Sequence, residues 1–153
     1  MLSTTLPLLS LGAVAVPFVT ALIIVMTPQR AAKWLCITAA AISTLFTLLI
    51  WGNLAASGLD SITVPLAQST QVIGLIFDKV SVMLAPCFVG IGLLISIYSV
   101  GYMNAGNREH PDAPRRRFYA FFTVFIGAMA GLVYSSTVIG QLMFFEITGA
   151  CSW

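Results

Sequence analysis

Charged side chains are scarce in this chain. Only 8% of its residues are charged, 59% are hydrophobic, and the mean hydropathy is +0.99. Such values exclude an ordinary soluble domain. The formal net charge of +2 is too small to indicate a nucleic-acid partner. We therefore expect the hydrophobic runs to cross a lipid bilayer and the charges to gather in the loops between them.

Motifs for metals and redox cofactors are also missing. Cys36, Cys87 and Cys151 lie in apolar runs without the paired spacing of a metal site or a disulfide framework. His110 has no second ligand nearby in the sequence, and no phosphate-binding glycine loop or haem ligand pair is present. We predict no cofactor, no metal and no catalytic redox site in this chain, so that any redox chemistry belongs to other subunits.

The apolar runs predict an all-α transmembrane fold in one membrane domain over residues 1–153. A helix needs roughly 20 residues to span the hydrocarbon core. Pro17 lies inside the first span, where it frees the carbonyl of Ala13 from its helical hydrogen bond. We expect four complete transmembrane helices plus a truncated fifth, at approximately 6–26, 32–50, 80–102, 118–134 and 137–153.

The fifth helix is expected to stop inside the membrane. Its 16 or so residues rise about 25 Å, which leaves the terminal carboxylate short of the far interface. We interpret the chain as the N-terminal portion of a longer subunit. Expressed alone, it is expected to insert poorly or to be degraded, and an extension by the parent's next residues should rescue it.

A short β-hairpin is expected between the second and third spans. Residues 61–64 alternate between polar and apolar side chains, residues 72–77 are rich in β-branched and aromatic residues, and the polar stretch 68–71 separates them. Pro65 restricts the first of these segments to the edge of a sheet.

Lysine and arginine predict the topology. Arg30 and Lys33 follow the first span, and Arg108 and the run 115–117 lie between the third and fourth spans, so that these six fall on one side. Lys79 is the single basic residue on the other side. By the positive-inside rule, the N-terminus faces away from the cytoplasm. The arginine run is interpreted first as this orientation signal, with a lipid headgroup site as the alternative.

Glu146 is the candidate for proton translocation. It is the one carboxylate that hydropathy places deep in a span, where an ionised side chain costs about 3 kcal/mol or more. Gly149 and Ala150 share its helix face and leave room for water or for a close-packed helix. Gln141, Thr148 and Ser152 form a second stripe, a possible polar helix face turned toward other helices. The alternative is that Glu146 is a structural hydrogen-bond donor without a role in transport.

A family resemblance is carried by several motifs. Residues 77–81 (Phe-Asp-Lys-Val-Ser) and 97–103 (Ile-Tyr-Ser-Val-Gly-Tyr-Met) resemble the two ends of the third helix in the antiporter-like subunits of complex I (NADH-quinone oxidoreductase) and of Mrp-type cation/proton antiporters. Residues 107–111, 125–133, 140–141, 144–149 and 151–153 are similar to the D-type antiporter-like subunit of bacterial hydrogenase-4. The resemblance covers essentially the whole chain.

The resemblance implies a function and an assembly. Family members have about fourteen spans, and a glutamate on the fifth helix pairs with a lysine on a later helix; Glu146 matches that glutamate. The implied protein is part of a membrane subunit of a hydrogenase-4 or complex-I-like assembly in the bacterial inner membrane. It couples electron transfer to proton or cation movement, and its partners are other membrane and peripheral subunits and the bilayer.

Two other functions stay open from the residues. One is a small self-contained proton-coupled transporter, although the six-to-one bias of basic residues fixes one orientation, unlike a dual-topology protein. The other is a structural membrane subunit that moves no ion.

Overall fold

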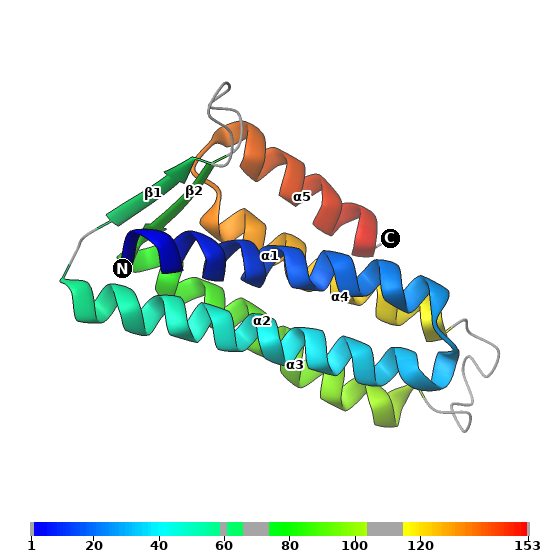
Figure 1. Ribbon diagram of the computed structural model, residues 1–153. Helices are drawn as coiled ribbons and strands as arrows, with labels where there is room; N and C mark the ends of the chain where they lie inside the picture. The colour runs from blue at the N-terminus through cyan, green and yellow to red at the C-terminus, as the bar shows by residue number, and fades with distance from the viewer. Residues whose placement is uncertain (1, 59–60, 66–73, 104–114, 153) are drawn as a thin grey trace.

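The protein is a bundle of antiparallel helices, with a small hairpin at one end (Figure 1). The computed structural model describes residues 2–58, 61–65, 74–103 and 115–152. The helices are α1 (Leu2–Met26), α2 (Gln29–Ser57), α3 (Lys79–Tyr102), α4 (Arg115–Tyr134) and α5 (Val138–Ser152). Within the described residues, four helices are long and apolar enough to cross a membrane, and α5 is a shorter apolar helix of 15 residues. The predicted all-α transmembrane fold, with four full spans and a shorter fifth, is confirmed.

Each of the first four helices packs against at least two others, and α4 packs against all four. α1 lies against α2 and α4, α3 also lies against α2 and α4, and α2 contacts α4 across the bundle. α5 packs mainly against α4 and runs at an angle over the bundle in Figure 1. α5 is therefore attached along one side and presents its other side outward.

Three helices extend beyond the predicted spans by three residues or more, and α1 is one of them because it begins at Leu2, four residues before its predicted start. α2 continues to Ser57 and stops at Gly58, whose φ of 66° is the left-handed conformation that glycine adopts without strain. α4 begins at Arg115, so its first turn contains all three arginines. The spans predicted to end at residue 50 and to start at residue 118 were too short. Hydropathy marks only the part of a helix that crosses the hydrocarbon, whereas backbone hydrogen bonding continues into the polar interface.

The predicted hairpin is confirmed. Strands β1 (Ser61–Pro65) and β2 (Gly74–Asp78) pair antiparallel, with Pro65 opposite Gly74 at the end of the ladder. β2 faces the bundle: Leu75 forms a bridge with Ser135, and the Phe77 ring lies 4.9 Å from the Tyr134 ring between centroids. The hairpin thus closes the bundle end where α2 stops and α3 begins.

Asp78 connects the hairpin to α3. Its side chain accepts a hydrogen bond from the Ser81 backbone amide at 2.8 Å, and its own amide donates to the Ser81 hydroxyl at 3.0 Å. This reciprocal pair is a capping box, which satisfies the first amides of a helix. The motif at residues 77–81 therefore has a structural explanation: Phe77 packs in the core and Asp78 starts the helix.

Pro17 brings three helices together. The Ala13 carbonyl, which Pro17 frees, accepts a hydrogen bond of 2.7 Å from the buried Ser43 hydroxyl of α2. On the other side, a Cβ at Gly127 of α4 would come within 3.0 Å of the Pro17 ring. The missing backbone hydrogen bond of α1 is thus replaced by one between helices.

Candidate ion-translocation site

Glu146 lies near the middle of the apolar helix α5 on its exposed side. It lies eight positions after Val138, a rise of about 12 Å, close to half of a hydrocarbon core about 30 Å thick. Among the described residues, no hydrogen-bond or ion-pair partner is found for its carboxylate. The structure therefore presents an exposed carboxylate on the outer side of an apolar helix.

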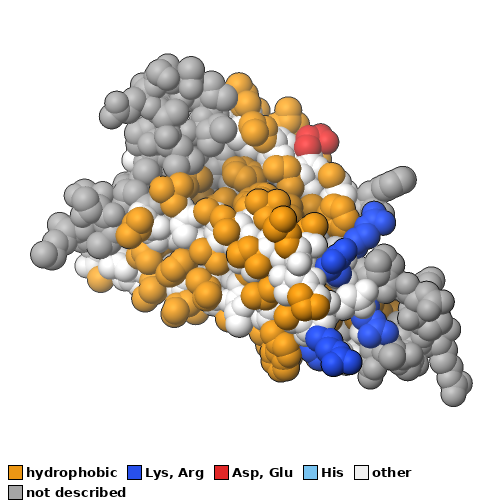
Figure 2. Space-filling view, turned by 45° about the vertical axis from the view of Figure 1, so that its right-hand side comes forward, with side chains coloured by type: hydrophobic (Ala, Val, Ile, Leu, Met, Phe, Trp, Pro, Cys, Tyr) orange, Lys and Arg blue, Asp and Glu red, His pale blue; other side chains and the backbone are white. Residues whose placement is uncertain are grey.

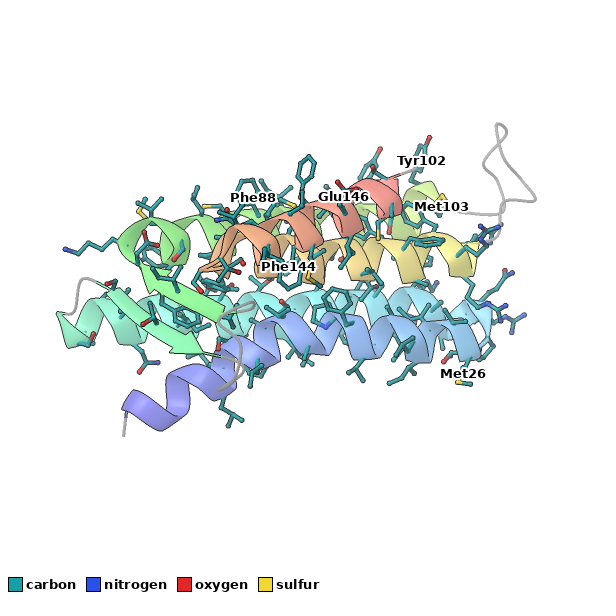
Figure 3. The ribbon with its side chains drawn as sticks, turned by 90° about the horizontal axis from the view of Figure 1, so that it is seen from above. Met26, Phe88, Tyr102, Met103, Phe144 and Glu146 are labelled. Carbon is teal, nitrogen blue, oxygen red and sulfur yellow. The ribbon has the colours of Figure 1, made fainter. Side chains whose placement is uncertain are left out.

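Phe144 fixes which side of α5 faces outward. Its ring lies so close to Gly131 of α4 that a Cβ there would collide with it. Two residues along a helix turn the side chain by about 200°, so Glu146 points away from α4, as Figure 3 shows. Gly127 and Gly131 of α4 are both buried against neighbouring side chains, as is typical of small residues in a helix-packing face.

The surroundings of Glu146 are apolar and open. Met143 is 48% exposed and Phe145 61% exposed on the same outer side. A Cβ at Gly149 would meet nothing within 4 Å, and Ala150 is exposed. In a bilayer this surface faces lipid or another helix, and the small residues leave space beside the carboxylate for either water or a partner.

The predicted stripe of polar residues is divided in the structure. Thr148 is buried and its hydroxyl donates to the Phe145 carbonyl at 2.6 Å. Gln141 and Ser152 are exposed: the Gln141 amide donates to the Ser135 carbonyl at 3.4 Å and the Ser152 hydroxyl to the Gly149 carbonyl at 2.9 Å. Every one of these bonds stays within α5 or the turn before it, and Glu146 is not brought into contact with the stripe.

The described basic residues other than Lys79 gather at one end of the bundle (Figure 2). Arg30 and Lys33 of α2 and Arg115 of α4 line one cavity of about 700 Å³, together with Val100 of α3 and Met103 just after it. Lys79 lies at the other end of α3, beside the hairpin. The prediction that the two basic loops share a side is consistent with this geometry. Arg108 and His110 lie outside the described residues.

Two further polar groups were not singled out from the sequence. The Ser43 hydroxyl donates the hydrogen bond that the Ala13 carbonyl of α1 otherwise lacks. The buried Tyr134 hydroxyl has no hydrogen-bond partner among the described residues. A proline four residues after Ala13 signalled a free carbonyl, but the donor depends on how α2 is rotated. The described residues contain no group of three or more His, Cys, Asp or Glu side chains that could hold a metal, and all three cysteines are free.

The fold and this site define a multi-pass membrane protein with a carboxylate on an apolar helix. Residues 64–119 match the family described as NADH-ubiquinone oxidoreductase (complex I), chain 5 N-terminus. The chain is 32% identical over 92 residues, 60% of its length, to the chloroplastic NAD(P)H-quinone oxidoreductase subunit 5 of Adiantum capillus-veneris. It is 34% identical over 80 residues, 52% of its length, to NAD(P)H-quinone oxidoreductase chain 5 of Picosynechococcus sp..

A match to an antiporter protein covers more of the chain. The similarity to the antiporter subunit mnhA2 of Staphylococcus aureus is 26% identity over 145 residues, 92% of this chain. The matched regions make up 12%, 11% and 18% of the three relatives. The chain is similar to antiporter-like membrane subunits of the complex-I type, and it spans less than a fifth of the length of these relatives.

Proposed function

We propose that this chain forms part of a proton-translocating membrane subunit and that Glu146 is a titrating group on its ion path. The observation that carries the proposal is the exposed position of Glu146 on an apolar helix face, with no partner among the described residues. A carboxylate facing hydrocarbon costs about 3 kcal/mol, so this face is suited to contact water or a further helix that supplies a cation.

The assembly is proposed to be an electron-transfer complex of the hydrogenase-4 or complex-I type. The similarity to complex-I-type subunits supports a membrane subunit among other membrane and peripheral subunits, and the motifs at residues 107–111 and 144–149 favour the hydrogenase-4 branch. The residues here are proposed to be the first helices of that subunit, with protons, or alternatively sodium, as the transported ion. The location is the bacterial inner membrane, with the N-terminus on the outer side.

Replacing Glu146 by Gln tests the role of the carboxyl group. The change keeps the side-chain volume and removes the titration. In inverted membrane vesicles that contain the assembled parent complex, we expect Glu146→Gln to lower proton pumping at least tenfold, because groups that transfer protons directly typically contribute about 10²–10⁴-fold. Assembly, measured from the amount of complex in the membrane, should change far less.

Two matched variants control for side effects. Met143→Gln places the same amide one turn earlier on the outer side of α5 and should leave pumping near wild type. Glu146→Asp retains a carboxyl group and should retain part of the activity. Wild-type pumping in an assembled Glu146→Gln complex would reduce Glu146 to a packing residue and leave a structural subunit as the better interpretation.

A further inference from the structure

An apolar groove runs between α1 and α4 and ends at an arginine. The α1–α4 groove has a volume of about 430 Å³. Its floor is formed by small buried residues, Ala21 at 3% and Ala120 at 7% exposure. Its walls are Leu22 and Val25 of α1 and Phe121 of α4, which are 71%, 55% and 46% exposed. Small residues below and large ones beside them create a channel along the surface.

Of the described residues that line this groove, Arg117 is the single polar one, and it lies at the end where α4 begins. No ion pair joins it to a carboxylate in the part of the chain that the structure describes. That end also carries Arg30, Lys33, Arg115 and Arg116, as Figure 2 shows by the gathering of basic side chains. A cation at the mouth of an apolar channel at a helix end, where membrane and water meet, matches a phosphate attached to a hydrocarbon chain.

A second groove lies on the other flank of α4. It has a volume of about 660 Å³ and shares Arg117 and Phe121 with the α1–α4 groove. Arg117 and Phe121 are one turn apart and form the ridge between the two channels. A molecule with one phosphate and two hydrocarbon chains fits this arrangement, with its phosphate on Arg117 and one chain on each side of Phe121.

We propose that the α1–α4 groove and Arg117 form a binding site for an anionic phospholipid. A small hydrated anion gains nothing from the apolar walls, so the hydrocarbon part of the ligand is required. A headgroup with its own cation, such as choline, would bring that positive charge next to Arg116 and Arg115, so a headgroup with net negative charge is favoured.

The test uses the full chain in nanodiscs that contain traces of either phosphatidylglycerol or phosphatidylcholine, each with the same photoreactive acyl chain. We expect phosphatidylglycerol to label groove residues about fivefold more than phosphatidylcholine, the contribution of one arginine near the membrane surface. Arg117→Gln should remove this preference. Arg116→Gln removes the same charge from the neighbouring residue, which lines neither groove, and should keep the preference.

A second pair of variants tests the channel itself. Val25→Phe narrows the groove and should reduce labelling of its walls, whereas Ile23→Phe, also exposed on α1 but outside the groove, should not. Both sites are more than 45% exposed, so the bundle tolerates the larger ring.

Several outcomes would overturn the proposal. Equal losses in Arg116→Gln and Arg117→Gln would indicate a general surface-charge effect. Equal labelling by the two lipids would mean that Arg117 does not select the charge of the headgroup. Displacement of the label by inorganic phosphate alone would indicate a small-anion site. Cross-links between copies of the chain through the groove, in place of lipid labelling, would indicate a protein interface.

Discussion

In this protein one side chain replaces a backbone hydrogen bond that a proline removes. Pro17 interrupts the ladder of α1, and the Ser43 hydroxyl binds the carbonyl that Pro17 frees. In hydrocarbon no water is available to do so. One hydroxyl therefore connects α1 to α2 and also satisfies the backbone carbonyl that α1 leaves without a donor.

Replacing Ser43 by Ala is expected to lower the free energy of unfolding by about 1 kcal/mol, the typical value for such a hydrogen bond in a membrane protein. The measurement is denaturation of the purified chain in bicelles. Thr38→Val removes a hydroxyl bonded only to its own helix and is the matched control. It should lower the free energy of unfolding by less than Ser43→Ala does.

A double-mutant cycle with Pro17→Ala sharpens this prediction, because alanine restores the amide that can bind the Ala13 carbonyl. The cost of Ser43→Ala should then shrink. An unchanged cost in the Pro17→Ala background would show that Ser43 stabilises the protein by packing and not through that carbonyl.

At the scale of elements, α3 depends on its capping box. Hydrogen bonds from the side chain and backbone amide of Ser81 hold the pKa of the Asp78 carboxyl below its ordinary value. A depressed pKa in the folded state means that the charged carboxylate stabilises the fold above the unfolded pKa of about 3.9. That contribution is lost as the pH falls through the folded pKa.

Asp78→Ala is accordingly expected to cost about 1 kcal/mol at neutral pH, as is usual for loss of an N-cap. Asp78→Asn retains a capping oxygen and should cost less. When thermal unfolding is measured from neutral pH down to about pH 3, the stabilities of wild type and Asp78→Asn should converge. Parallel stability curves across that range would remove Asp78 as a source of pH dependence.

The contact of α5 with α4 depends on Gly131. Gly131→Ala would place a Cβ against the Phe144 ring, and such overpacking costs about 1–3 kcal/mol. Gly149→Ala makes the same substitution where a Cβ meets nothing within 4 Å and should be neutral or slightly stabilising. Unfolding measured on both variants separates steric fit from helix propensity; equal effects would argue against a Gly131–Phe144 contact.

At the scale of the whole molecule, the arrangement of basic residues predicts a single orientation in the membrane. After replacement of the three native cysteines, a cysteine at Ala56 should react with a membrane-impermeant reagent added outside intact cells. A cysteine at Gln29, at the opposite end of α2, should react only after the membrane is opened. The reverse pattern would overturn the proposed topology.

Composition and spacing were enough to predict the helices, the hairpin and the common side of the arginine loops, because each depends on local hydropathy, turn residues and charge. They were not enough to predict that Ser43 meets Ala13 or that Phe144 fits against Gly131, since these contacts depend on the rotation of one helix against another. Glu146 was identified from its depth alone. Its exposed position on the far side of α5 from α4 required the structure.

The pairing of Ser43 with Ala13 also bears on how the chain enters the membrane. Until α2 is present, the Ala13 carbonyl of α1 would face lipid without a donor, at a cost of several kcal/mol. α2 begins at Gln29, only three residues after α1 ends at Met26. The first two helices are thus the smallest unit with this carbonyl satisfied, and biogenesis should proceed by insertion of a helical pair.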